Sequence, residues 1–480
     1  MFPRIARYRT VDEVIERFKE LSIDLPIDHE VLTAESGSPL ASPLTMGSIT
    51  AGNRFVIHPM EGWDATSDGL PTEPLLRRWR RFGISGAKCI WGGEAVAVVP
   101  QGRAHPHQLE AGRLGTLGMQ QLCSLVHTAH REKFGTDEDL VVALQLTHSG
   151  RYARPTVAGA SPRIAYHHPV LDSEMAISSK GDPRIVSDQE IEKEGGIIDT
   201  FVCAAENASA AGFDMVDVKA CHSYLIHEFL SARRRPGRWG GDFEGRTRLL
   251  CSIVERIRER VPRLAIGVRL SIFDTVPWRK TFNRGEPLIG KNEEYDCGFG
   301  INIHSPHEID LAEPIELVRR LRDLGVVAVN LTAGSPYNSP HISRPALFPP
   351  SDGYPPPEDP LIGVARQIHA ARKVKQAVEG IVTVGTAYTY LQEYLPHVAQ
   401  ATVRSGWIDA VGLGRMVLSY PEFPTDILTS GKLARTSICR TFSDCTSGPR
   451  NGLASGCYPL DEYYKRSPDG ESLRAIKSRE

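Results

Sequence analysis

The stretch GMQQLCSLVHTAHREKF (118–134) followed by LVVALQLTH (140–148) sets the pattern of this chain. The first segment has the apolar spacing of an amphipathic helix, and the second is a short β-branched run that ends in polar residues. The same alternation recurs on both sides, and strands that alternate with helices are typical of parallel βαβ units. We predict eight strands, at 54–60, 88–98, 140–148, 215–221, 264–271, 326–334, 381–387 and 409–415.

The expected helices between these strands lie at 75–82, 118–134, 190–212, 245–261, 313–325, 361–379 and 395–406. Eight strand–helix units favour an α/β fold of the closed (β/α)8 TIM-barrel type. The alternative is a doubly wound open sheet, which usually has fewer strands and a Gly-rich first turn. No GxGxxG motif follows the first strand, so we predict the barrel.

The predicted barrel occupies residues 46–431, after an N-terminal helix and connector over 1–45 and before a C-terminal tail over 432–480. Two long segments, 273–310 after strand five and 335–360 after strand six, are predicted to be loops. Barrel enzymes build their substrate pockets from loops at the carboxyl ends of the strands. We therefore expect both loops on the active-site side.

The composition excludes several classes of protein. The 480 residues are 41% hydrophobic and 24% charged, and the net charge of -2 includes no strongly basic or acidic block, so binding to nucleic acid or to a membrane surface is not expected. No apolar run is long enough for a membrane span, and the N-terminal residues lack the apolar region of a signal peptide. Nine thinly spread cysteines favour a reducing compartment, for which the cytoplasm is the default.

Polar residues gather where the predicted strands end. A buried polar group is unfavourable unless it is paired, so this concentration predicts a ligand that pairs with them. The residues at these strand ends, many of them polar, are His58, Pro59, Met60, Glu61, Gly92, Gly93, Glu94, Gln145, His148, Lys219, His222, Tyr224, Arg269, Gly385, Gly412 and Gly414.

Several of these residues lie in motifs that resemble the Old Yellow Enzyme family of NAD(P)H:flavin oxidoreductases. The motifs are NRFVIHPM (53–60), QLTHSGR (145–151), GFDMVDVKACHSYLIHEFLS (212–231), GVRLS (267–271) and VGLGRM (411–416), in the order of that family. The resemblance extends from about residue 40 to about residue 425. It is closest to the barrel part of the 2,4-dienoyl-CoA reductase-like branch, without that branch's second nucleotide-binding domain.

The resemblance implies FMN as cofactor and NADH or NADPH as reductant. Gln145 would bind the pyrimidine edge of the flavin, and Arg269 would supply a permanent cation near N1 and O2. The phosphate would be held by Gly385, Gly412, Gly414 and Arg415. The remaining flavin neighbours implied by the family are Pro59, Met60, Glu61 and Glu94; for Glu94 a barrel-interior acid is the alternative.

The resemblance also implies the substrate site. Two residues at the end of strand four hold the substrate carbonyl oxygen, and these are Lys219 and His222, while Tyr224 protonates the neighbouring carbon. The family usually has His where Lys219 stands. This departure predicts a substrate that carries or develops negative charge, unless Lys219 pairs with an acid such as Glu94 or Asp217.

Glu61 is a second departure, because the family usually has Thr or Cys after Pro-Met. A carboxylate there would disfavour the anionic reduced flavin. The alternative is an ion pair between Glu61 and Lys219, which would couple the two departures.

The predicted activity is hydride transfer from NAD(P)H through the flavin to an activated C=C of a carbonyl compound, with an anionic, thioester or aromatic substrate. One alternative is an oxidative flavin dehydrogenase or demethylase, and another is an aldolase-type barrel with Lys219 as Schiff-base nucleophile. The expected partner is a small-molecule substrate. A homo-oligomer stays open, since the family often forms dimers or tetramers.

Three cysteines in the tail, Cys439, Cys445 and Cys457, resemble part of the iron–sulfur motif of larger relatives. Cys445 and Cys457 keep the relatives' spacing of eleven intervening residues, but Thr441 and Phe442 lie where another ligand would stand. Three thiolates are one short of a four-cysteine cluster, so we expect no iron–sulfur cluster and no metal site.

Overall fold

The predicted barrel is confirmed in the computed structural model, which describes residues 2–175, 184–282 and 284–478. Parts of the predicted N-terminal extension, strand-five loop and tail, at residues 1, 283 and 479–480, lie outside these ranges. Each barrel strand pairs in parallel with the next, and the last pairs with the first. The strands, in barrel order, are β3 (Phe55–Ile57), β4 (Cys89–Ile90), β6 (Val141–Thr147), β7 (Met215–Ala220), β8 (Ala265–Ser271), β13 (Ala328–Thr332), β14 (Val382–Gly385) and β15 (Ala410–Leu413).

The second predicted strand, 88–98, is interrupted. It forms β4 and then β5 (Ala95–Ala97), which pairs beside β6. Gly92 and Gly93 between them have φ of 134° and 48°, and a Cβ on Gly93 would lie 2.7 Å from the ring of Trp79. The backbone therefore turns tightly over a buried Trp, which an L side chain at Gly93 would prevent.

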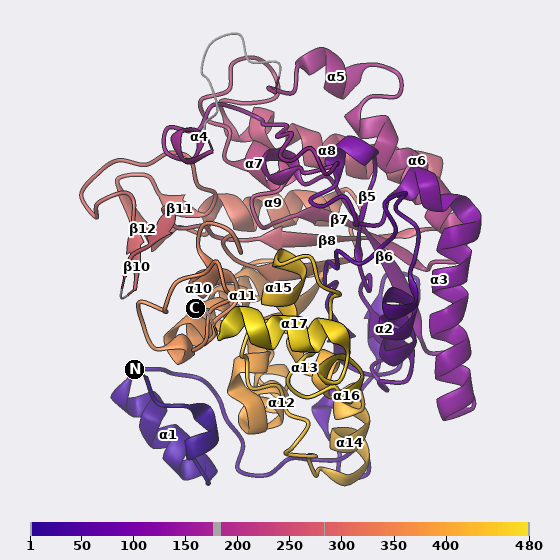
Figure 1. Cartoon of the computed structure of the whole chain (residues 1–480), viewed down its shortest axis with the longest axis vertical. Helices are drawn as coiled ribbons and strands as arrows, with labels where there is room; N and C mark the ends of the chain where they lie inside the picture. The colour runs from indigo at the N-terminus through magenta and orange to yellow at the C-terminus, as the bar shows by residue number, and fades with distance from the viewer. Residues whose placement is uncertain (1, 176–183, 283, 479–480) are drawn as a thin grey trace.

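Amphipathic helices cover the outside of the barrel, as predicted (Figure 1). They are α2 (Glu73–Gly83), α3 (Ala111–Phe134), α6 (Ile197–Ala210), α8 (Phe243–Arg260), α9 (Ala312–Asp323), α11 (Pro360–Ala377) and α12 (Leu395–Arg404). The single helix predicted over 190–212 is wrong in its first part. A short α5 (Asp188–Glu192) ends before Gly195, whose φ is 69°, and α6 begins after Gly196.

Short hairpins are the main feature that the periodicity did not predict. β1 (Leu44–Met46) pairs with β2 (Ile49–Ala51), and side chains of both strands share one apolar cluster with residues of the barrel interior such as Trp91. This hairpin therefore closes the amino-terminal end of the barrel. The segment 273–310, predicted to be a loop, carries β9 (Trp278–Lys280) with β10 (Gly285–Pro287), and β11 (Ile301–Asn302) with β12 (Ser305–Ile309). Strands this short contain too few alternating residues to give a pattern.

The C-terminal tail folds back onto the barrel. Its helices α15 (Asp444–Arg450), α16 (Glu462–Lys465) and α17 (Pro468–Lys477) lie near the centre and lower part of the face shown in Figure 1, whereas α1 (Val11–Glu20) lies at the lower edge. The Ser447 Oγ accepts the backbone N–H of Ser351 at 3.0 Å, and the Arg78 Nη1 donates to the Ser455 carbonyl at 2.7 Å. The tail is thus bound both to the strand-six loop and to α2. None of the helices in the described ranges is long and apolar enough to cross a membrane.

Candidate active site

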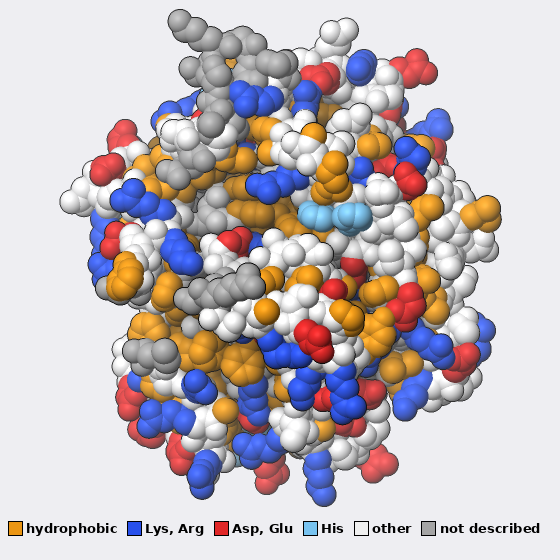
Figure 2. Space-filling model, viewed as in Figure 1, with side chains coloured by type: hydrophobic (Ala, Val, Ile, Leu, Met, Phe, Trp, Pro, Cys, Tyr) orange, Lys and Arg blue, Asp and Glu red, His pale blue; other side chains and the backbone are white. Residues whose placement is uncertain are grey.

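A cavity of about 1320 Å³, including its open mouth, lies at the carboxyl ends of the barrel strands. The face in Figure 2 is hollowed above its centre, where apolar and basic side chains and histidines meet. The predicted site residues that line the cavity are Pro59, Met60, Glu61, Gln145, Lys219, His222, Tyr224, Arg269, Gly412, Gly414 and Arg415.

Barrel register brings the polar strand-end residues together. Lys219 on β7 pairs with Arg269 on β8, and Arg269 pairs with Asn330 on β13, so the three occupy one row around the barrel. Asp217 accepts the Nε2 of Gln145 and the backbone N–H of Arg269, both at 2.6 Å. One buried acid therefore orients the amide of Gln145, which also lines the cavity.

Arg269 and His58 are the buried polar groups that fit a bound flavin. The Nη1 of Arg269 donates to the Pro59 carbonyl at 3.1 Å, but its buried Nε has no hydrogen-bond partner among the described residues. The Nδ1 of His58 lies 3.0 Å from the Nδ2 of Asn330, and the His58 Nε2 likewise has no partner there. Unused donors beside a cavity favour a ligand that accepts, and the flavin N1–O2 edge is such a group.

His58 also explains one of the predicted phosphate-site glycines. A Cβ on Gly412 would lie 1.9 Å from the His58 ring, so the ring fills the space that a side chain would need. Gly385 does not appear in the cavity wall, and its Cβ would meet Ile408 at 2.9 Å. Gly414 meets nothing closer than 4.0 Å, which leaves room for a ligand beside it. The phosphate role of these glycines stays a prediction.

Glu94 lies behind the cavity wall. Its carboxylate accepts the Arg78 Nε at 2.9 Å and the Gly62 N–H at 2.6 Å, and Asp64 shares the same guanidinium through two contacts of 2.9 Å. Burial raises the pKa of Glu94 to about 7. This environment agrees with the barrel-interior acid, and contact of Glu94 with the flavin stays a prediction.

The two residues in which the chain departs from the family, Glu61 and Lys219, contact each other. The Glu61 carboxylate lies 3.1 Å from the Lys219 Nζ, and it accepts the Tyr224 hydroxyl at 2.6 Å and the Trp63 Nε1 at 3.0 Å. The ion pair that we considered between Glu61 and Lys219 is therefore present, and pairing of Lys219 with Glu94 or Asp217 is not found. Burial, and then the Glu61 carboxylate, raise the pKa of Tyr224 well above its ordinary value, so Tyr224 is a neutral hydroxyl.

His222 is held in the cavity by a strained turn. His222 and Ser223 have φ of 64° and 60°, a left-handed conformation that residues other than glycine rarely adopt. The His222 N–H donates to Ser271 Oγ at 3.1 Å, and the Ser223 N–H donates to His227 Nδ1 at 2.9 Å. Burial, and then Arg269 and Lys219, lower the pKa of His222 well below its ordinary value, so its ring is neutral.

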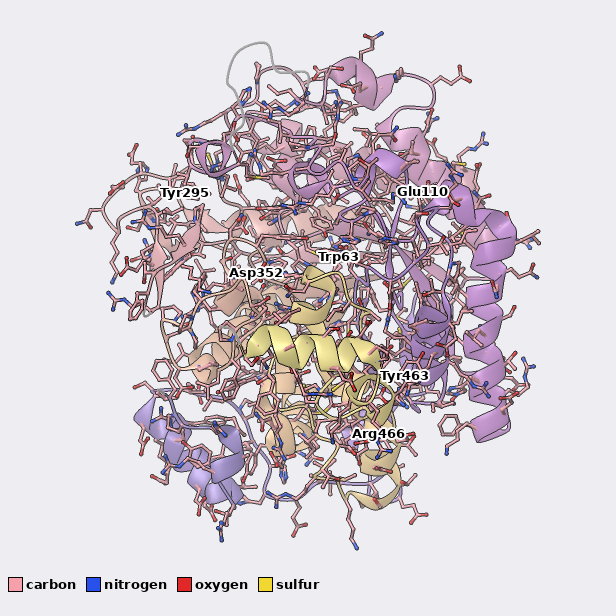
Figure 3. The ribbon with its side chains drawn as sticks, in the orientation of Figure 1. Trp63, Glu110, Tyr295, Asp352, Tyr463 and Arg466 are labelled. Atoms are coloured by element: carbon pink, nitrogen blue, oxygen red, sulfur yellow. The ribbon has the colours of Figure 1, made fainter. Side chains whose placement is uncertain are left out.

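The sequence did not predict several further residues of the cavity wall, of which five have large or polar side chains that the argument below uses. Trp63 follows the first strand, Tyr337 and Arg344 lie in the Pro-rich loop after β13, and Thr446 and Arg450 lie on α15. The loop was expected to reach the site, but the tail sequence carries no motif for ligand binding, and α15 is only seven residues long with Pro449 inside it. Figure 3 shows Trp63 and Asp352, the partner of Arg450, near the centre of the face beside the tail helices.

The tail cysteines lie near one another. Cys439, Cys445 and Cys457 line one small pocket and are free thiols. Burial raises the pKa of Cys439 to about 11, which disfavours the thiolate form that binds metals. Among the described residues, no group of three or more Cys, His, Asp or Glu side chains is arranged to hold a metal ion.

The sequence is similar to known flavin oxidoreductases. It is 26% identical over 408 residues to the NADH oxidase of Thermoanaerobacter brockii, covering 84% of this chain and 52% of that protein, so it spans about half the length of this relative. An NADH:flavin oxidoreductase of Gibberella zeae is 26% identical over 81% of this chain and 85% of its own length. An NADPH dehydrogenase of Geobacillus thermodenitrificans is 25% identical over 80% and 92%.

Solved structures share the fold. Morphinone reductase in complex with tetrahydroNAD aligns with a TM-score of 0.54 at 20% identity, over 82% of this chain and 91% of that one. 2-Naphthoyl-CoA reductase in complex with 2-naphthoyl-CoA aligns with a TM-score of 0.63 at 19% identity, over 89% and 57%. The profile of the NADH:flavin oxidoreductase / NADH oxidase family matches residues 39–289, a little over half of the chain. The chain therefore belongs to this family and is an oxidoreductase whose cofactors are FMN and NADH or NADPH.

Proposed function

We propose that this protein transfers hydride from NADH or NADPH, through FMN, to an activated C=C bond of a carbonyl compound. The observation that carries the proposal is the meeting of two sets of residues in one cavity. Gln145 and Arg269 offer donors suited to a flavin, and His222 and Tyr224 offer donors suited to a carbonyl substrate. Bound FMN would supply the hydride acceptor and donor.

The chain's own residues would hold the carbonyl oxygen. His222 is neutral, so one of its two ring nitrogens carries an N–H that can donate, while Lys219 adds a cation whose charge Glu61 balances. Two donors aimed at one oxygen stabilise the negative charge that develops there as the β-carbon is reduced. Because Lys219 already has a counter-ion, it attracts a free substrate anion less than an unpaired lysine would.

Tyr224 would supply the proton. Its hydroxyl lies between the Glu61 carboxylate at 2.6 Å and the Tyr337 hydroxyl at 3.2 Å. The hydroxyl gives its proton to the substrate α-carbon and is reprotonated through Tyr337. General acid catalysis of this kind is worth about 10²–10⁴ in rate.

Flat aromatic walls support a conjugated or aromatic substrate. Tyr337 is stacked on Tyr152 at 4.0 Å, and Trp63 on His105 at 5.0 Å with 6° between the planes. Trp63 and Tyr337 line the cavity, and a planar ligand can stack on flat rings of this kind. The spacing of Cys445 and Cys457 supports a place in the 2,4-dienoyl-CoA reductase-like branch, for which a thioester is the matching substrate class.

A second candidate is oxidation of an amine or alcohol, and the bond from Tyr224 to Glu61 favours it. A hydroxyl that donates to a carboxylate leaves its oxygen lone pairs free to accept a proton from a substrate. In that direction Tyr224 would pass its own hydroxyl proton to the Glu61 carboxylate as it accepts the proton of the substrate.

An anaerobic experiment with the purified protein separates the two candidates. Enzyme reduced with NADH is mixed with enones, unsaturated acids and aromatic thioesters, and oxidised enzyme is mixed with amines and alcohols. The proposal expects an enone-type compound to restore the absorbance of the oxidised flavin. Bleaching of the oxidised flavin by an amine or alcohol, without reoxidation by any C=C compound, would replace it with the second candidate.

A further inference from the structure

A second cavity lies where the N-terminal segment, the loop after β13 and the C-terminal tail meet. It has a volume of about 580 Å³ including its open mouth, and no residue in the described ranges lines both this cavity and the active-site cavity. Its wall includes Ile5 of the turn Ile5–Arg7, Leu347 and Phe348 of the loop, Tyr390 of the helical turn Tyr388–Tyr394, and Thr441 and Phe442 of the tail. In Figure 1 the N-terminal end lies at the lower left, beside the orange segments that follow β13. The size is typical of a small-molecule site, and the proposed reaction does not use it.

Two hydroxyls in this wall have no hydrogen-bond partner. Tyr390 and Thr441 are both 1% exposed, and neither the Tyr390 Oη nor the Thr441 Oγ1 has a partner within the part of the chain that the structure describes. By contrast, Tyr388 in the same turn pairs its buried hydroxyl with the Thr402 Oγ1 at 3.1 Å. An unpaired buried hydroxyl is unfavourable, and it can either donate or accept, so the two hydroxyls suit a ligand that carries an oxygen atom.

Two residues of the wall also have a strained backbone. Gln392 and Thr441 have φ of 53° and 54°, in the left-handed region, where a β-branched residue such as Thr is especially unfavourable. The same conformation occurs at His222 and Ser223 in the active site. Because strain of this kind clusters at ligand sites, its presence here is a second, independent sign of a binding function.

Arg440 joins the two strained residues and has its charge balanced. Its Nη1 donates to the Gln392 Oε1 at 2.8 Å, and it forms an ion pair with Glu393 at 2.7 Å. Arg440 directly precedes Thr441, so these contacts fix the tail against the turn that carries Gln392. Since Glu393 balances the guanidinium, this side of the cavity does not favour a charged ligand.

The rest of the wall is apolar and aromatic. The ring centres of Phe348 and Phe442 lie 5.2 Å apart, with 45° between the planes, and Ile5 and Leu347 are buried in the same wall. Arg4 is exposed at the cavity mouth, with its guanidinium 5.2 Å from the centre of the Phe348 ring. Aromatic and aliphatic walls with a few polar groups favour a ligand with an aromatic body and one polar end.

We propose that this cavity is a second ligand site, for a small uncharged aromatic molecule that carries a hydroxyl or carbonyl oxygen. The Tyr390 and Thr441 hydroxyls bind the oxygen, and Phe348 and Phe442 contact the ring. The site goes beyond the proposed function, because it lies outside the cavity proposed for flavin and substrate. Other residues of the same loop and tail line the active site, so a ligand here also braces two segments that build that site.

The first experiment measures the binding of two probes that differ in their polar atom, 2-naphthol and 2-methylnaphthalene. Equilibrium dialysis with the FMN-loaded protein gives the total amount bound, and the flavin absorbance, which a ring stacked on the flavin perturbs, reports binding in the active-site cavity. We expect bound 2-naphthol beyond the amount that the flavin absorbance reports. At that site 2-methylnaphthalene binds about three- to tenfold more weakly, as expected for the loss of one hydrogen bond.

Variants then test which hydroxyls take part. Tyr390→Phe and Thr441→Val each remove one oxygen at nearly constant volume, so each lowers the preference for 2-naphthol over 2-methylnaphthalene about three- to tenfold, whereas Thr441→Ser keeps it. Tyr388→Phe is the matched control, because it removes a hydroxyl of the same turn that already has a partner and lies outside the cavity wall. It leaves the preference unchanged.

Melting temperatures without probe separate a ligand site from a structural role. The Tyr390 hydroxyl has no partner among the described residues, so Tyr390→Phe leaves the melting temperature unchanged or raises it, whereas Tyr388→Phe breaks a hydrogen bond and lowers it. A lower melting temperature in Tyr390→Phe, together with equal weakening of both probes, would show that the hydroxyl only supports the fold and would overturn the proposal.

Two further results would also overturn it. One is that the flavin absorbance accounts for all of the bound 2-naphthol. The other is that the preference between the probes stays within about twofold of wild type in both Tyr390→Phe and Thr441→Val. Probe bound outside the active site, with a preference that falls in either variant and not in Tyr388→Phe, supports the site.

Discussion

The two sides of the cavity are built differently. The strand-end wall, made by Gln145, Lys219 and Arg269, is held by the register of adjacent parallel strands. The tail-side wall, made by Arg344, Thr446 and Arg450, is held by contacts between segments about a hundred residues apart, such as the bond from Arg344 to Thr446. The first wall suits chemistry that needs fixed geometry. The second can change with the tail, and so can adapt one barrel to different ligands.

The charges of the two walls are similar. On the strand-end wall Lys219 pairs with Glu61, but among the described residues the Arg269 guanidinium has no carboxylate within ion-pair distance, because Asp217 accepts only its backbone N–H. On the tail-side wall Arg450 pairs with Asp352, and Arg344 has no carboxylate within ion-pair distance in the same described ranges. The two walls therefore differ in how they are held in place and not in their charge.

The largest effect that we predict tests the strand-end wall. Tyr224→Phe removes the proton donor, so the rate at which an enone reoxidises the reduced enzyme falls by about 10²–10⁴. Reduction of the flavin by NADH, followed by stopped-flow absorbance, changes much less. Tyr337→Phe serves as the control and has a smaller effect, because its hydroxyl reaches the reaction only through Tyr224. Equal reoxidation rates in Tyr224→Phe and wild type would remove Tyr224 from the reaction.

The second effect concerns the link between barrel and tail. Arg78→Met leaves the buried carboxylates of Asp64 and Glu94 without their cation and frees the Ser455 carbonyl of the tail. We expect a loss of about 3–5 kcal/mol in the free energy of unfolding, measured with denaturant. Adding Glu94→Gln restores part of it.

The control for this change is Arg80→Met. Arg80 pairs with Glu132 on the surface, with both side chains about 60% exposed, so its loss changes stability little. A similar small loss in Arg78→Met would show that the buried cluster does not hold the tail on the barrel.

A third change tests close packing under the strand-end wall. Gly412→Ala places a Cβ against the His58 ring and forces that ring to move, which costs about 1–3 kcal/mol in stability. Gly414→Ala is the matched control, because its Cβ meets nothing closer than 4.0 Å. If the two variants unfold at the same denaturant concentration, the packing explanation for Gly412 is wrong.

The smallest effect is on pH dependence. Glu61 helps to raise the pKa of Tyr224, so Glu61→Gln lowers that pKa. Tyr224 then loses its proton at lower pH, and the alkaline fall in enone reduction moves to lower pH. Trp63→Phe is the control. It removes the hydrogen bond from Trp63 to Glu61 but leaves the bond from Tyr224 to Glu61, so the alkaline fall in the rate stays at the same pH. If the alkaline fall in the rate of enone reduction stays at the same pH in Glu61→Gln, or moves to higher pH, then Glu61 does not raise the pKa of Tyr224.

The part of the site that the sequence predicted is the part that regular structure positions. Gln145, Lys219 and Arg269 follow β-branched runs, and the carboxyl ends of parallel strands meet at one edge, so their convergence is predictable. The ion pair of Lys219 with Glu61 was one of several open alternatives, since spacing along the chain does not specify which acid a lysine reaches. Glu94 has a local position like that of Glu61, yet Arg78 on α2 takes its carboxylate.

The tail could not be placed from its sequence. Its helices are short, and α15 contains Pro449 and Gly448, so no periodic pattern indicated a helix there. Arg450 reaches the cavity through contacts with Pro336 and Asp352, more than ninety residues away in the chain. Contacts of that separation depend on the whole fold, and no local feature of the tail predicts them.

The most direct test of the central claim is an anaerobic titration of the purified protein with NADH. We predict a yellow protein that holds one FMN per chain and loses its flavin absorbance with about one equivalent of NADH. The Arg269→Met variant binds FMN, or stabilises its reduced form, much less than wild type does. A protein that binds no FMN when the cofactor is supplied, or that holds FMN but is not bleached by NADH or NADPH, would contradict the central claim.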